Sequence, residues 1–329
     1  MARDFLRRQF ICTLGSVAVW PLAAHAQQTK MRTIGLVGGA TAAAQAGWTA
    51  AFVHKLRELR WIDGQNVTIK YHWLEGHLHR ASDVLAELAH SNVDVIVTHS
   101  TPLVLAAKQW NSVIPIVFAS AGDPIRNGIV ASLARPGGNL TGLSVQTTDL
   151  AGKQVELLQN LLPKLRHFAF LYHLGNPVTQ LQLDGVKAAA NKFKLDWTVA
   201  EVRGPDDVAP TIESLRGRAE ALIVPSTPLH NTMRNEISSA ALRAKLPTIY
   251  FDRMYVETGG LMSYGPNWPS MWERAAVFVD KILNGAKPDT IPVEQPPKFD
   301  LVINLKTAQA LGMSRLPRLL QARATELIE

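Results

Sequence analysis

The sequence repeats one order of strand and helix patterns, and this repeat restricts the fold more than any other feature. In the first half, short apolar runs rich in β-branched residues alternate with stretches whose apolar residues recur at helical spacing. The strand-like runs are Arg32 to Gly38, Val67 to Trp73, Val93 to Thr98 and Ile114 to Phe118. Alternation of this kind predicts a parallel sheet with helices on both faces.

The same order restarts in the second half of the chain. The strand-like runs are His167 to Tyr172, Trp197 to Val202, Ala221 to Pro225 and Thr248 to Phe251. Helical patterns lie between them, one of them near Thr211 to Arg218. Residues 31–147 and 148–264 therefore look like two copies of one topology. We predict an α/β fold with two similar doubly wound parallel-sheet lobes.

A repeated tetrapeptide indicates where a ligand would bind. Residues 100–103 and 226–229 both read Ser-Thr-Pro-Leu, and each follows an apolar strand and opens a helix. We expect Thr101 and Thr227 at the N-cap, with proline at N1. Free N–H groups and the helix dipole there favour a carboxylate, and ligands of open α/β sheets bind beyond the carboxyl ends of the strands. Two such lobes would enclose a cleft; the alternative is that both motifs merely cap ordinary helices.

Further polar residues occupy equivalent turns, and an Asp beside helix N-termini would suit a zwitterion by taking its ammonium group. The candidate ligand-binding residues are Thr41, Ser100, Thr101, Ser120, Asp123, Asn176, Ser226, Thr227, Asp252 and Tyr264. Asp123 and Asp252 could instead be plain turn residues. Tyr255, Tyr264 and Trp268 are candidates for stacking on a planar ligand, and the alternative for Tyr264 is interlobe packing.

Residues 1–26 have the pattern of a secretory signal peptide. Arg3, Arg7 and Arg8 precede a mostly apolar stretch, and residues 24–26 read Ala-His-Ala, which is a cleavage pattern. Arg7 and Arg8 also resemble a twin-arginine signal, so both export routes stay open. The single cysteine, Cys12, lies in this segment. We therefore expect an exported product without a disulfide or a cysteine metal site.

The charge distribution and the lack of known motifs disfavour several other classes of protein. The net charge of +7 is spread over 329 residues without a basic cluster, so we expect no nucleic-acid partner. No apolar run after the signal is long enough to cross a membrane. His72, His77 and His79 could bind zinc, but a solvated loop is the preferred interpretation, and we expect no metal or cofactor. The glycines at 35–39 lack dinucleotide-binding spacing, and no hydrolase, metalloprotease or Walker motif occurs.

Several segments resemble one known family. They are residues 56–76, the Asp-Pro turn at 123–124, and residues 130–144, 259–267, 280–288 and 293–312. The chain is identified as a member of the ABC-transporter substrate-binding proteins of the tryptophan/tyrosine type, which have the type I periplasmic-binding-protein fold. The resemblance implies a periplasmic, non-enzymatic, hinged binder that passes a small solute to a permease driven by an ATPase. We expect a monomer.

In this family the chain crosses between lobes three times, which we place near Thr147, Tyr264 and Asp289. Lobe I would then comprise residues 31–147 and 265–288, and lobe II residues 148–264 and 289–329. The helix Ser270 to Leu283 fits lobe I, with Ser270 and Glu273 as an expected capping box.

The sequence is compatible with more than one ligand and with more than one role. Many family members have Asp where His77 or His79 stands, and Glu near Arg253. An amino-acid-like solute or another small carboxylate fits the pattern. The alternatives are a two-lobe ligand sensor without a transport role and an exported enzyme. A sugar-repressor-like regulator would need a helix-turn-helix where the export signal lies.

Overall fold

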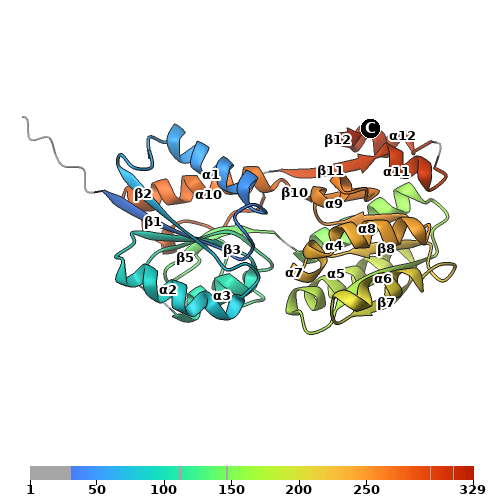
Figure 1. Cartoon of the computed structure of the whole chain (residues 1–329), viewed down its shortest axis with the longest axis horizontal. Coiled ribbons are helices and arrows are strands. Elements are labelled where there is room, and N and C mark those ends of the chain that lie inside the picture. Colours follow the sequence, from blue (N-terminus) through green and yellow to red (C-terminus); the bar gives the residue numbers. More distant parts are fainter. Residues whose placement is uncertain (1–30, 111–112, 146, 297, 314) are drawn as a thin grey trace, which may run out of the picture.

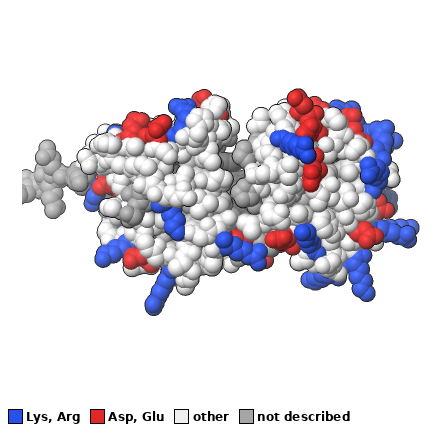
Figure 2. Space-filling model, turned by 90° about the horizontal axis from the view of Figure 1, so that it is seen from below, with Lys and Arg blue, Asp and Glu red and all other residues white. Residues whose placement is uncertain are grey.

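The computed structural model describes residues 31–329 except 111–112, 146, 297 and 314. The predicted signal peptide, with Cys12, lies outside the described residues. The chain forms two α/β lobes side by side, and the space-filling view shows a groove between them (Figures 1 and 2). The predicted architecture of two parallel-sheet lobes is confirmed.

The first lobe is built on a five-stranded parallel sheet in the order β2-β1-β3-β4-β5. Its strands are β1 (Arg32–Gly38), β2 (Val67–Trp73), β3 (Val95–His99), β4 (Ile116–Ala121) and β5 (Leu140–Ser144). Its helices are α1 (Ala46–Glu58), α2 (Ala81–His90), α3 (Thr101–Trp110), the 3₁₀ turn η1 (Leu78–Arg80) and, from much later in the chain, α10 (Trp268–Leu283). Both faces of the sheet are apolar and buried, as helices on two sides require.

The second lobe has a seven-stranded sheet in the order β12-β11-β10-β9-β8-β6-β7. Its strands are β6 (His167–His173), β7 (Asp196–Val202), β8 (Ala221–Val224), β9 (Thr248–Tyr250), β10 (Met262–Pro266), β11 (Phe299–Asn304) and β12 (Glu326–Ile328). Its helices are α4 (Thr147–Leu161), α5 (Pro177–Phe193), α6 (Pro205–Glu213), α7 (Pro228–Thr232), α8 (Arg234–Arg243), α9 (Arg253–Glu257), α11 (Leu305–Ala310) and α12 (Arg318–Arg323). Among the described strands only the β10–β11 pair is antiparallel, because the chain re-enters this lobe from the opposite direction.

Three connections join the lobes. The chain leaves the first lobe after β5, returns between β10 and α10, and leaves again before β11 (Figure 1). The segment from η2 (Pro288–Thr290) to Glu294 still belongs to the first lobe: Thr141 Oγ1 donates to the Ile291 carbonyl, and Glu294 pairs with β5. The third connection therefore follows Glu294, later than the predicted position near Asp289. The other predicted crossings, near Thr147 and Tyr264, stay a prediction.

Two local predictions were wrong. The helix expected near Thr211 to Arg218 is α6, which begins earlier because Pro205 stands in its first turn, where a missing N–H costs nothing. The expected capping box of Ser270 and Glu273 does not form. Asn267 caps α10 instead, and its Oδ1 accepts the Ser270 N–H at 2.9 Å.

Candidate functional site

The predicted ligand-binding residues lie near the carboxyl ends of the strands in both lobes. In the first lobe, Thr41 follows β1, Ser100 and Thr101 follow β3, Ser120 lies in β4 and Asp123 follows it. In the second lobe, Asn176 follows β6, Ser226 and Thr227 follow β8, Asp252 follows β9 and Tyr264 lies in β10. The helices that open at the repeated tetrapeptide, α3 and α7, lie on the inner sides of their lobes (Figure 1).

A cavity of about 520 Å³ lies between the lobes, next to the β10 connection. Its wall combines the start of α1 in the first lobe, α9 in the second, and the residues that join β10 to α10. The lining residues are Ala43, Ala44, Gly47, Trp48, Arg234, Phe251 to Met254, Glu257, Thr258, Ser263, Gly265 to Pro269 and Asp300. Of the ten predicted residues only Asp252 is among them. The size suits a small organic solute.

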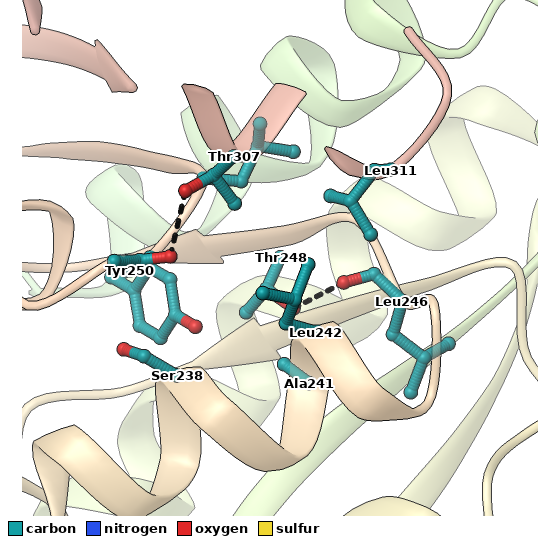
Figure 3. A pocket seen from close by; sticks show the side chains of 11 residues that line it. Ser238, Ala241, Leu242, Leu246, Thr248, Tyr250, Thr307 and Leu311 are labelled. Carbon is teal, nitrogen blue, oxygen red and sulfur yellow. Dashed lines mark hydrogen bonds between the residues drawn. The ribbon is translucent and has the colours of Figure 1, made fainter. Parts of the chain in front are cut away.

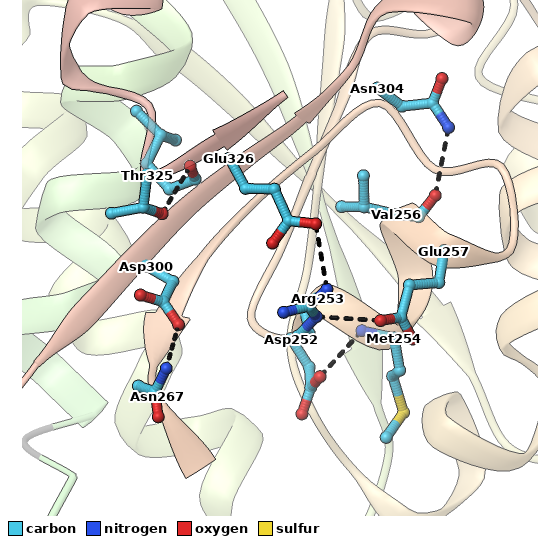
Figure 4. A network of polar contacts seen from close by, with 11 residues as sticks. Asp252, Arg253, Met254, Val256, Glu257, Asn267, Asp300, Asn304, Thr325 and Glu326 are labelled. Atoms are coloured by element: carbon cyan, nitrogen blue, oxygen red, sulfur yellow. Dashed lines mark hydrogen bonds and ion pairs between the residues drawn. The ribbon is translucent and has the colours of Figure 1, made fainter. Parts of the chain in front are cut away.

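Asp252 is a buried carboxyl group in this wall. It caps α9, where its Oδ1 accepts the Met254 N–H at 2.9 Å, and only 4% of the residue is exposed. Burial raises the pKa of Asp252 to about 6, although the Met254 N–H works in the other direction. The neighbouring Arg253 is held by Glu257 and Glu326 at 2.9 and 3.2 Å (Figure 4). The Asp252 carboxylate therefore has no ion pair within 4.0 Å among the described residues.

The repeated tetrapeptide has two different local structures. Thr227 is the N-cap of α7, and its Oγ1 accepts the His230 N–H at 3.1 Å, as expected. Thr101 is already helical, so the prediction of an N-cap there was wrong. Its Oγ1 accepts the Gly122 N–H at 2.9 Å and ties α3 to the end of β4. Ser100 before it has φ of 68°, and its N–H donates to the Ser120 carbonyl.

The other predicted polar residues also make local contacts. Thr41 Oγ1 accepts the Ala44 N–H at 3.3 Å, and Ser226 Oγ donates to Asn231 Oδ1 at 3.1 Å. The backbone carbonyls of Asp123 and Asn176 accept from Asn127 and Thr179. These contacts fix the turns at the strand ends, which is the structural role that the sequence left open.

Two tryptophans of the first lobe belong to the cavity wall. Trp48 of α1 and Trp268 of α10 have ring centroids 5.4 Å apart. The buried indole N–H of Trp268 has no hydrogen-bond partner within 3.5 Å among the described residues, but it is near enough to Asp252 to lower the pKa of that carboxyl group. Trp268 was among the predicted stacking residues, whereas Trp48 was not. Tyr255 stacks on Tyr250 in the core of the second lobe, and Tyr264 stacks on Phe299 beside the connection.

His99, at the end of β3, was not singled out in the sequence. Its Nε2 accepts the Gly39 N–H at 3.3 Å and also contacts the side-chain amide of Gln45. Burial lowers the pKa of His99 to about 4. The signal that could have found it is its position directly before the first Ser-Thr-Pro-Leu.

Neither the depression around Ser238 nor the pair His77 and His79 forms a second candidate site. The depression around Ser238, Thr248 and Thr307 in Figure 3 has no interior space for even a water molecule. The His77 and His79 rings lie 5.6 Å apart, and no group of three potential metal ligands exists in the described part of the chain. No helix in the same part is long and apolar enough to cross a bilayer.

A comparison with family models gives the family of the chain. The family model described as ABC transporter substrate binding protein matches residues 47–328. A tyrosine-binding protein of Clostridioides difficile is 26% identical over 265 residues, covering 80% of this chain and 76% of that protein.

Two solved structures have a closely similar fold. A domain crystallised with L-Trp from Streptococcus pneumonia is 26% identical, with a TM-score of 0.83, and covers 91% of this chain and all of that one. A conserved domain protein from Vibrio cholerae is 25% identical, with a TM-score of 0.84 and the same coverage.

Proposed function

The chain belongs to the ABC transporter substrate-binding protein family, with the type I periplasmic-binding-protein fold, and from this premise we propose that it captures an amino-acid-like solute between its lobes. In this proposal the protein is exported through residues 1–26, acts as a monomer in the periplasm, and delivers the solute to a membrane permease with its ATPase. It carries out no chemical reaction on the solute.

The observation that carries the proposal is the pairing of charge and aromatic surface in one cavity. Asp252 offers a buried carboxylate from the second lobe that has no ion pair among the described residues, and Trp48 and Trp268 offer apolar ring surface from the first. A carboxylate suits an ammonium group, and indole rings suit a planar or apolar side chain. The similarity to a tyrosine-binding protein and to an L-Trp-bound domain supports the same ligand class.

Ligand binding would favour closure, because a solute that touches both walls of the cavity gains contacts only when the lobes approach each other. A closed form that differs in shape from the empty form is what a permease could distinguish. The three connections allow such a motion without breaking either sheet.

A thermal-unfolding screen tests the function directly. The mature chain is mixed with L-tryptophan, L-tyrosine, other amino acids, simple carboxylic acids and sugars, and small molecules that co-purify with it are identified by mass spectrometry. A bound amino acid at about 100 times its Kd should raise the unfolding free energy by about 2.7 kcal/mol. Stabilisation by sugars only, or turnover of a solute, would contradict the proposal.

A further inference from the structure

The imidazole of His99 holds a hydrogen-bond donor that nothing in the described residues uses. His99 ends β3 directly before Ser100, at the carboxyl edge of the first sheet, and stays partly exposed there. Its Nε2 accepts the Gly39 N–H and also contacts the Gln45 amide. No hydrogen bond to Nδ1 exists within the described part of the chain.

The contacts of His99 determine which nitrogen carries the proton. Because the Gly39 N–H needs an acceptor at Nε2, we assign the proton of the neutral ring to Nδ1. The lowered pKa of His99, about 4 because of burial, keeps the ring neutral at pH 7. Trp48 and Trp272 pack against it with centroid distances of 5.9 and 5.6 Å and hold its orientation. The result is a fixed, neutral N–H donor.

The surroundings of this donor favour a carboxylate as its partner. Trp48 contacts the His99 ring and also lines the cavity, so one aromatic side chain connects His99, which is not itself a lining residue, to the proposed binding space. The α3 helix begins two residues later, and its N-terminus adds partial positive charge. A carboxylate is a stronger acceptor than a neutral carbonyl or hydroxyl group.

We propose that the Nδ1–H of His99 donates to the carboxylate of the bound solute and makes the site selective for acids over their neutral derivatives. This inference rests on the proposed function and adds a specificity-determining residue to it. With Asp252 on the second lobe taking the ammonium group, an amino acid would be oriented across the cleft, its carboxylate toward β3 and its ammonium toward α9.

A matched pair of substitutions separates the two ring nitrogens. In His99→Gln the amide can replace Nε2 and accept the Gly39 N–H, but the donor at the Nδ1 position is lost. In His99→Asn the shorter amide can supply a donor near the Nδ1 position, while the acceptor for Gly39 is lost. Each variant is titrated calorimetrically at pH 7 with L-tryptophan and with L-tryptophanamide, which keeps the ring and ammonium but lacks the carboxylate.

We expect the wild-type protein to prefer L-tryptophan to its amide. His99→Gln should lose about tenfold to a hundredfold in affinity for L-tryptophan and little for the amide, since a hydrogen bond to a charged group is removed. His99→Asn should keep most of the preference. Circular dichroism and thermal unfolding confirm that both variants are folded.

The outcomes distinguish this inference from the proposed function. If the wild-type protein binds L-tryptophan and folded His99→Gln binds it equally well, the assignment of His99 is overturned and the function stands. If both variants lose affinity for the acid and the amide to the same degree, His99 only supports the wall, and the assignment is again overturned. If the wild-type protein binds no amino acid, the proposed function and this inference fall together.

Discussion

At the residue scale, Asp252 is the group whose position is hardest to explain by stability. An Asn would cap α9 as well as an Asp does. The raised pKa of Asp252, about 6 because of burial, means that its ionised form opposes folding at neutral pH. A carboxylate that costs stability and lies in the wall of a cavity is best explained by the ligand it meets.

The pH dependence of stability tests this view of Asp252. Since its folded-state pKa lies above the ordinary value of 3.8, its contribution to stability is largest below about pH 4 and is lost as the pH rises through about 6. Asp252→Asn should therefore be more stable than the wild-type protein at pH 7, by up to about 3 kcal/mol, and no more stable near pH 4. Urea unfolding at both pH values measures the difference.

The same variant should bind an amino acid at least about tenfold more weakly at pH 7, because the partner of the ammonium group is gone. Wild-type affinity should fall as the pH drops through about 6. Unchanged binding by Asp252→Asn would reduce Asp252 to a helix cap.

At the element scale, the N-terminus of α10 lies next to a connection between the lobes and also links them by a side-chain contact. Asn267 caps α10 through its Oδ1, and its Nδ2 donates to Asp300 of β11 at 2.7 Å (Figure 4). One side chain thus links a helix of the first lobe to a strand of the second. Gln154 of α4 instead joins elements within the second lobe, because its amide donates to the carbonyls of Tyr250 in β9 and Tyr264 in β10.

Substitution of Asn267 separates its two contacts. Asn267→Ser keeps a cap but loses the bond to Asp300, and Asn267→Ala loses both. We expect Asn267→Ala to be less stable than Asn267→Ser by about 1 kcal/mol, the usual value of an N-cap. Chemical denaturation of the two variants gives the difference, and equal stability would show that the cap is dispensable.

At the scale of the whole molecule, the arrangement of two sheets with three connections makes relative lobe motion the expected response to a ligand. The cavity wall draws on α1 and α9, which belong to different lobes, so its volume depends on how the lobes lie.

Small-angle X-ray scattering of the mature chain tests closure. Saturating L-tryptophan or L-tyrosine should lower the radius of gyration, and Asp252→Asn at the same ligand concentration should show a smaller decrease. A radius that stays constant while calorimetry shows binding would contradict the closure model.

The sequence by itself determined the two-lobed α/β fold, because strand and helix periodicities are local properties that 3.6- and 2-residue repeats encode directly. The β1 and β2 bounds and the N-cap at Thr227 follow from such patterns. The sequence also pointed to Asp252 from its position after a strand.

Only the tertiary structure decided which residues share the cavity. Trp48 and Trp268 are far apart in the chain and meet because α10 returns to pack against α1. The proton of the neutral His99 ring is assigned to Nδ1 because Nε2 accepts the N–H of Gly39, which follows another strand. The two Ser-Thr-Pro-Leu segments differ in local structure because Thr101 accepts the Gly122 N–H. Such long-range contacts depend on how the chain crosses between lobes, and no local pattern of residue types carries that information.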